Sequence, residues 1–259
     1  MVYNVRSIKY KDGVVDTRIY SRALENERKR LKGYIAKCKR EKSDVAKEDD
    51  RRRSANRCKN VIYQLARNQK WDYFVTLTLD SKKIDRYNYD ILQKKMTSWL
   101  RNLRRVAPDM IYLFVPEHHK DGAYHFHGLI GRCGNIRFVD SGHKDHKGRS
   151  IYNIGNYRFG WSTATPVTDN ESVIRYISKY ITKELITDTI GKKHYWASRN
   201  LDRPAEVLSY EDEFGKCALW QELGETAISY SEVKNQFQGV MYIRSNPSSL
   251  NIEDISFES

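Results

Sequence analysis

The chain has 259 residues, 39% of them hydrophobic, which is enough for one sizeable domain or two small ones with a buried core. Its formal net charge of +13 favours nucleic acid as a partner. No stretch approaches the ~18 apolar residues of a membrane span, no signal-peptide pattern is present and the four cysteines lack disulfide or metal spacing, so we expect a cytoplasmic protein without membrane contact.

The positive charge is concentrated in residues 1–70, which contain 21 Lys and Arg against nine Asp and Glu. Residues 3–20 are expected to form a short hairpin with its turn at Lys11-Asp12-Gly13. Residues 21–68 have the composition of a charged helix. We therefore predict that residues 1–70 form a basic, mostly helical region that contacts DNA. The alternative is a solvated helix with internal ion pairs.

A strand and a helix are predicted next. Tyr73–Leu79 alternates apolar residues with threonines, so Thr76 and Thr78 share one face of a strand. These threonines either line a DNA cleft or are ordinary strand formers. Apolar residues then recur every three or four positions over 92–106, which predicts a helix whose other side is basic. The apolar positions are Leu92, Met96, Trp99, Leu103 and Val106, and the basic ones are Lys94, Lys95, Arg101, Arg104 and Arg105.

A hairpin is predicted over residues 111–130, with Asp121-Gly122 in its turn. If residues 120–122 form a three-residue loop with Gly122 in the left-handed conformation, Glu117 lies directly opposite His125. His125 and His127 are two residues apart in a strand and therefore share a face. A two-residue turn would instead place Glu117 on the other face, because a shift of one residue reverses every side chain.

Two imidazoles and one carboxylate on one face are a suitable ligand set for Mn²⁺ or Mg²⁺. We therefore predict a divalent metal site made of Glu117, His125 and His127. His119 shares the face of Glu117 and is a possible fourth ligand, a support for a ligand or a residue that only lines the cleft. The alternative for the whole segment is a solvated hairpin edge.

A second helix is predicted from the capping-box spacing of Thr168 and Glu171. Tyr176 and Tyr180 are four residues apart, so they lie one turn apart on this helix, and a lysine follows each of them by three positions. The expected core positions are Ile174, Ile177, Ile181 and Leu185, and the two lysines are Lys179 and Lys183. Without the neighbouring metal hairpin, an amphipathic helix with interfacial tyrosines would be the simpler interpretation.

Three segments together resemble the HUH endonuclease superfamily: residues 74–79, Glu117 to His127, and Tyr176 to Lys183. The paired tyrosines are most similar to those of rolling-circle replication initiators of small phages and plasmids. The resemblance implies an enzyme that nicks single-stranded DNA at a replication origin in a bacterial host cell. It implies Tyr176 and Tyr180 as nucleophiles, Lys179 and Lys183 as their helpers, and the metal at the hairpin.

The chemistry is consistent with these residue types. A phosphodiester is an anionic and unreactive electrophile, so its cleavage needs a nucleophile, charge neutralisation and positioning. Attack by a tyrosine leaves a 5′-phosphotyrosine and a free 3′-hydroxyl that a polymerase can extend, and the phosphotyrosine bond allows the strands to be rejoined later. The sequence does not rank Tyr176 against Tyr180, and an enzyme with one catalytic tyrosine remains an alternative.

The order strand, helix, strand, strand, helix predicts an α+β fold: a ferredoxin-like or RRM-like palm with a central antiparallel sheet and helices on one face. We expect the endonuclease domain at residues 71–204, and at residues 205–259 a C-terminal extension that packs on it and ends in a loose tail. No phosphate-binding Gly-x-x-x-x-Gly-Lys loop is present, so a host helicase and a DNA polymerase are expected partners. The alternatives are an HUH transposase, a mobilisation relaxase and a non-catalytic nucleic-acid-binding module.

Overall fold

The computed structural model of the protein describes residues 2–25, 44–189, 191–234 and 238–246. The chain divides into two compact units, one at residues 41–203 and one that combines residues 1–40 with residues 204–259. Each unit combines antiparallel strands with at least one helix, which confirms the predicted α+β class. No helix in these described ranges has the length and apolar character needed to cross a membrane.

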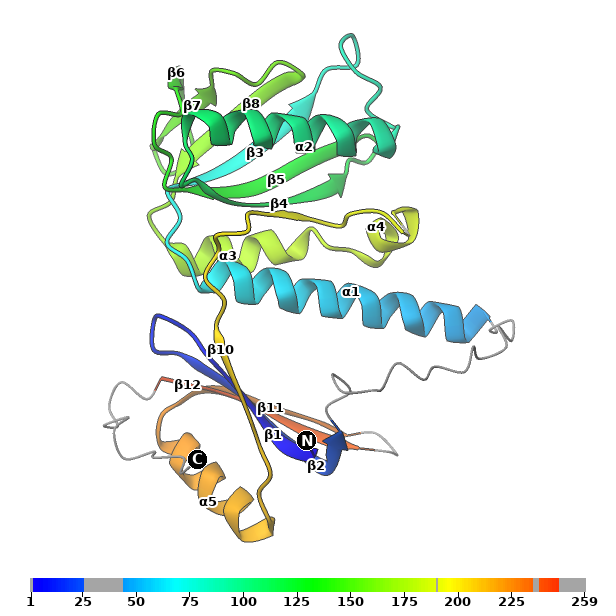
Figure 1. Cartoon of the computed structure of the whole chain (residues 1–259), viewed down its shortest axis with the longest axis vertical. Coiled ribbons are helices and arrows are strands. Elements are labelled where there is room, and N and C mark those ends of the chain that lie inside the picture. Colours follow the sequence, from blue (N-terminus) through cyan, green and yellow to red (C-terminus); the bar gives the residue numbers. More distant parts are fainter. Residues whose placement is uncertain (1, 26–43, 190, 235–237, 247–259) are drawn as a thin grey trace. The chain divides into compact units, whose positions relative to one another are not determined.

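The unit at residues 41–203 is built on a seven-stranded antiparallel sheet with the order β6-β7-β8-β3-β5-β4-β9 (Figure 1). Its strands are β3 (Tyr73–Leu79), β4 (Ile111–His118), β5 (Tyr124–Gly131), β6 (Phe138–Lys144), β7 (Ser150–Ile154), β8 (Gly160–Pro166) and β9 (Trp196–Ala197). Its helices are α1 (Asp44–Arg67), α2 (Tyr89–Val106), α3 (Asn170–Lys179) and α4 (Lys183–Asp188). Strands β3 and β5 lie in the middle of the sheet, so the predicted strand at residues 73–79 and the predicted hairpin are both central to the unit.

Helix α2 covers one face of this sheet. Its Trp99 ring packs edge-on against Phe114 of β4, with ring centroids 5.8 Å apart. Phe114 is opposite Gly128 of β5 in the register, and a Cβ atom on Gly128 would lie 2.2 Å from the Phe114 ring. Because no side chain fits there, the buried ring lies directly against the backbone of β5.

The tyrosine-bearing helix α3 lies on the opposite face. His127 is next to Gly128 in the strand, so its side chain points away from Phe114, and it is there that the ring of Tyr180 packs. The expectation that helices occupy only one face is therefore wrong in this detail. The sequence predicted both helices, but the return of α3 over the histidine face depends on contacts between residues far apart in the chain.

The predicted helix at residues 168–185 is interrupted. Helix α3 ends at Lys179, and Thr182 begins α4 by accepting a hydrogen bond from the Leu185 amide at 3.1 Å. The start also differs, because the N-cap is Asp169 rather than Thr168. The four expected core positions are buried as predicted, since each short helix keeps its own apolar face: Ile174, Ile177, Ile181 and Leu185.

The other unit contains a five-stranded antiparallel sheet with the order β10-β1-β2-β12-β11. Its strands are β1 (Val2–Lys9), β2 (Val15–Glu25), β10 (Ala205–Ser209), β11 (Ala227–Lys234) and β12 (Gly239–Ser245), and its helix is α5 (Glu213–Glu225). Leu219 and Trp220 of α5 pack against a small core of Val5, Ile19 and Ile243. The predicted hairpin at residues 3–20 is confirmed, with Gly13 at a φ of +83° in its turn.

This division differs from the boundaries expected at residues 70 and 205. Residues 2–25 are strands rather than helix, and α1 belongs to the unit with the predicted active site. Residues 205–245 supply three strands to the sheet that β1 and β2 begin, so they do not extend the catalytic unit. The abundant charge of residues 1–70 concealed a period-two pattern in β2, where Val15, Thr17 and Ile19 are buried. Residues 26–43 and the expected loose tail at 247–259 lie outside the described ranges.

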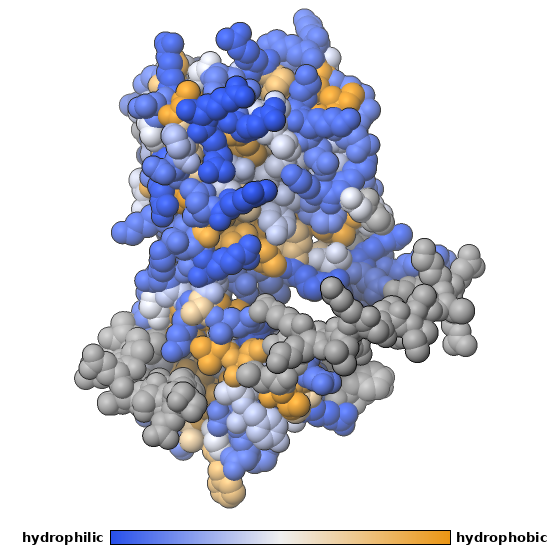
Figure 2. All heavy atoms as spheres, in the orientation of Figure 1, coloured by the Kyte–Doolittle hydropathy of each residue, from blue (hydrophilic) through white to orange (hydrophobic). Residues whose placement is uncertain are grey.

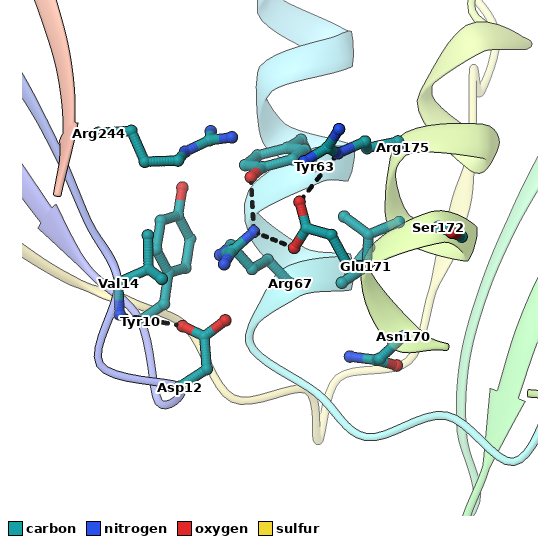
Figure 3. Close-up of polar contacts among 12 residues, drawn as sticks. Tyr10, Asp12, Val14, Tyr63, Arg67, Asn170, Glu171, Ser172, Arg175 and Arg244 are labelled. Carbon is teal, nitrogen blue, oxygen red and sulfur yellow. Dashed lines mark hydrogen bonds and ion pairs between the residues drawn. The ribbon is translucent and has the colours of Figure 1, made fainter. Parts of the chain in front are cut away.

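A buried ion pair joins α1 to the first turn of α3 (Figure 3). Arg67 is buried and donates to a Glu171 carboxylate oxygen at 2.5 Å and to the Tyr63 hydroxyl at 2.9 Å. The other Glu171 oxygen accepts from the exposed Arg175 at 2.9 Å. Burial acts to raise the pKa of Glu171, but the hydrogen bonds and charges of Arg175 and Arg67 outweigh it, and the net pKa is lowered. The contact fixes the start of the helix that carries both tyrosines.

We expect Glu171→Ala to lower the free energy of unfolding by about 1–3 kcal/mol, because it removes the carboxylate from a buried guanidinium. The matched control is Arg175→Gln, which breaks the exposed pair to the same carboxylate and should cost less than about 0.5 kcal/mol. Urea denaturation followed by tryptophan fluorescence measures both. Equal losses for the two variants would contradict a special role for the buried pair.

Candidate active site

The hairpin has the register that the three-residue loop predicts. Glu117 pairs with His125, the His119 amide donates to the Ala123 carbonyl at 2.7 Å, and Gly122 has a φ of +81°. These observations confirm that the carboxylate and both imidazoles project from the same face of β4 and β5.

His127 is held from both ring nitrogens. Its Nε2 lies 2.6 Å from Glu117 Oε2, and its Nδ1 lies 3.1 Å from the hydroxyl of Thr76 on β3. Burial lowers the pKa of His127 to about 4, so the ring is neutral at pH 7 and carries one N–H. With that hydrogen on Nε2, the ring donates to Glu117 and accepts from Thr76. A threonine hydroxyl also accepts hydrogen bonds, so Thr76 equally supports the tautomer with a free Nε2.

His125 has a different neighbour. Its ring stacks on that of His119, with centroids 4.5 Å apart and planes 20° apart. Burial is the main cause of a lowered pKa for His125, and the charges of His119 and His127 add to it. His118 points to the other face, where it packs on Tyr124 and lies 3.3 Å from Asp188. His119 therefore lies beside His125, whereas His118 has structural contacts.

The donor set of Glu117, His125 and His127 has the chemistry that a divalent cation needs. Both imidazoles have lowered pKa values and are neutral, and burial raises the pKa of Glu117 while the charges of His125 and His119 oppose this. Over the described residues, no three His, Cys, Asp or Glu side chains form a ready-made metal group. Glu117 and His127 are hydrogen-bonded to each other, so a cation would have to replace that bond. The residues fit Mn²⁺ or Mg²⁺ by type and by face, whereas their side-chain arrangement is that of the metal-free hairpin.

The two tyrosines meet this face of the hairpin. The Tyr180 ring stacks on His127 at a centroid distance of 3.8 Å and an interplanar angle of 7°, and only 8% of Tyr180 is exposed. Tyr176 is 46% exposed, and its ring lies 5.1 Å from that of Tyr180. Burial raises the pKa of Tyr180, and a hydrogen bond with Tyr176 raises it further. The structure thus distinguishes two phenols that the sequence left equivalent.

The two lysines do not share one arrangement. The Lys179 ammonium lies 5.9 Å from the centre of the Tyr176 ring, within cation–π distance. Lys183 is the first residue of α4, beyond the break after Tyr180, and its side chain lies outside the described part of the structure. The helical spacing expected between Tyr180 and Lys183 is therefore absent, although Lys179 lies beside Tyr176.

Strand β3 contributes two side chains to the same face. Phe74 packs against both His127 and Tyr176, at ring-centroid distances of 6.0 and 5.4 Å. The sequence prediction placed Thr76 on a possible cleft face but overlooked Phe74. The signal was present, because Phe74 and Thr76 are two residues apart in a strand and must share a face.

We expect Thr76→Val to weaken Mn²⁺ binding by about 10- to 100-fold, because valine keeps the shape of threonine but cannot hydrogen-bond to His127 Nδ1. Titration calorimetry with Mn²⁺ measures the change. Thr76→Ser should restore most of the affinity, and Thr78→Val on the same face serves as the matched control. An unchanged dissociation constant in Thr76→Val would show that the hydroxyl does not position the histidine.

Residues 72–185 match a family of replication-associated proteins, described as Replication-associated protein ORF2. The matched region begins just before β3 and ends within α4, so it contains the hairpin and both tyrosines. This similarity supports a replication-associated protein that binds DNA, which agrees with the expected class. The comparisons with curated proteins and with solved structures give no match.

Proposed function

We propose that the protein initiates rolling-circle replication by nicking single-stranded DNA at an origin through tyrosine attack. The observation that carries the proposal is the meeting of Tyr176, Tyr180 and the Glu117–His127 pair on one face of the sheet. The similarity of residues 72–185 to replication-associated proteins supports the same conclusion. The chain would act in the cytoplasm of a bacterial host, where a host helicase and DNA polymerase supply the unwinding and synthesis.

Glu117, His125 and His127 would hold Mn²⁺ or Mg²⁺. When bound, such an ion neutralises and polarises the scissile phosphate. The chain's own residues have separate tasks: Thr76 orients His127, and Phe74 packs the nearby rings in place. Lys179 lies where its charge favours ionisation of Tyr176 or stabilises the phosphate.

The two phenols would act in order, Tyr176 first. Its ring is about half exposed and accessible to a DNA strand, whereas Tyr180 is buried against His127. In the reaction, the Tyr176 oxygen forms a bond to phosphorus as the bond to the 3′-oxygen breaks. The phenolic proton leaves, and the departing oxygen takes up a proton to become a free 3′-hydroxyl. Tyr180 would then cleave the regenerated origin, and the two DNA ends would be exchanged and joined.

A covalent-adduct assay tests this proposal. The protein is incubated with Mn²⁺ and end-labelled single-stranded DNA from its own replicon, and the products are separated on a denaturing gel. We expect an adduct that resists boiling in detergent and that disappears in Tyr176→Phe/Tyr180→Phe. An adduct that persists in this double variant would refute the assignment of the nucleophiles, and a wild-type protein that binds the DNA without any adduct would favour a non-catalytic binding module.

A further inference from the structure

A second charged feature lies away from the tyrosines, in a cleft of about 950 Å³ within the unit at residues 41–203. One wall is the C-terminal half of α2, and the other is the segment at residues 192–203, which runs past β4 after α4 (Figure 1). No aspartate or glutamate lines the cleft. Five arginines do: Arg101, Arg104, Arg105, Arg199 and Arg203.

None of these five arginines forms an ion pair with a carboxylate among the described residues. Two lysines, Lys192 and Lys193, add to the charge, and of these Lys192 is paired with Asp90 at 2.8 Å. Many arginines elsewhere on the unit do have carboxylate partners, such as Arg67 with Glu171 and Arg149 with Asp145. The cleft is therefore a concentrated and uncompensated positive site.

The two walls converge on one aromatic residue. Burial raises the pKa of Tyr112 at the base of the cleft, while the charges of Arg104 and Arg199 act to lower it, which places both guanidinium groups near the same phenol. The dipole of α2 favours basic residues in its last turn and so accounts for Arg104 and Arg105. It does not account for Arg199 and Arg203, which the other wall brings to the same cleft. Like charges brought together from separate segments indicate an anionic ligand.

The cleft is also separate from the candidate active site. Tyr112 is two residues before Phe114 in β4, so its side chain lies on the α2 face of the sheet, opposite to His127. Figure 2 shows hydrophilic side chains over the side of this unit that carries α2. DNA bound in the cleft would therefore not compete with a strand at the tyrosines.

We propose that this cleft binds the phosphate backbone of duplex DNA. A duplex carries about one negative charge per 1.7 Å of its axis, a density that suits five arginines in one cleft. The rings that line the cleft are buried or half-buried, Trp196, Tyr112 and Tyr195, so they offer no open platform on which unpaired bases could stack. Arginine contacts to phosphate without base readout give binding that is strongly salt-dependent and insensitive to sequence. The inference goes beyond the proposed nicking activity and does not depend on it.

The test uses the full chain and fluorescently labelled duplex DNA of unrelated sequence, with EDTA present so that no cleavage occurs. In Arg101→Gln/Arg105→Gln/Arg199→Gln, we expect the slope of log affinity against log salt to become shallower by about 2 to 3, at ~0.9 per lost phosphate contact. The matched control, Lys82→Gln/Lys144→Gln/Lys147→Gln, removes the same charge from exposed positions outside the cleft and should change the slope by less than about 1. Both variants should keep the thermal midpoint of the wild type.

Two outcomes would overturn the proposal: equal changes in slope for the two triple variants, or a loss confined to single-stranded DNA while duplex binding is retained. Adduct formation on a short single-stranded oligonucleotide provides a separate readout, and the cleft variant should retain it. A protein that forms no adduct but loses duplex binding in the cleft variant would refute the nicking function and support the cleft. A protein with the reverse behaviour would do the opposite.

Discussion

Tyr176→Phe is expected to reduce the rate of first adduct formation by at least about a thousandfold, because it removes the nucleophilic oxygen and leaves the ring in place. Phenylalanine retains the packing against Phe74 and Tyr180, so the fold should be unaffected. Tyr180→Phe should retain most of the first adduct, because the Tyr180 hydroxyl is buried and its pKa is raised. It should instead fail to release closed circles after a round of synthesis. Rapid-quench assays on labelled origin DNA measure the first step, and peptide mapping of the adduct identifies the linked tyrosine.

The control for both single variants is Tyr210→Phe, which changes an exposed tyrosine of the other unit. Its adduct rate should equal that of the wild type. If Tyr180→Phe loses the first adduct while Tyr176→Phe keeps it, the proposed order of the two phenols is reversed. If each single variant retains the full rate, the tyrosines are interchangeable for the first cut.

His127→Ala is expected to weaken Mn²⁺ binding by more than about 100-fold, since loss of a direct ligand should exceed the loss of a residue that only supports one. Metal-stimulated cleavage should disappear with it, whereas binding to single-stranded DNA should remain. The structure gives a second reason for a large effect, because the ring of Tyr180 loses the surface on which it stacks. Titration with Mn²⁺ and the adduct assay at saturating DNA measure the two effects separately.

His143→Ala is the matched control, since His143 is an exposed histidine on β6 and has no proposed role at the metal. A glutamine at position 127 refines the experiment, because it fills part of the space of the imidazole and can still bond to Thr76. Full Mn²⁺ affinity in both His127 variants would remove this residue from the metal site and leave Glu117 and His125 without a third ligand.

The hairpin was predictable because its information is local. The Asp121-Gly122 turn and the alternation of side chains determine the register, and they place Glu117 opposite His125 without any distant contact. The burial of Ile174, Ile177, Ile181 and Leu185 followed from spacing in the same way. The contact between Tyr180 and His127 was beyond such reasoning, since it joins residues 53 positions apart and depends on how α3 crosses the sheet.

The errors have a common physical origin. Helix α3 was expected to continue to residue 185, but the hydroxyl of Thr182 supplies a cap that favours a new helix start over continuation. Residues 205–245 were expected to pack on the endonuclease region, yet β12 pairs with β2, more than 200 residues earlier in the chain. Strand pairing over such a separation leaves no mark in either segment alone.

The bare position at Gly128 limits how the histidine strand can be redesigned. Residues 125 and 127 point away from Phe114, so other metal ligands can be introduced there without affecting the packing under α2. Position 128 has no such freedom, because even a methyl group would meet an immobile ring and push the strand outward. A library intended to change the metal preference of this protein should therefore randomise the two histidines and keep the glycine that follows them.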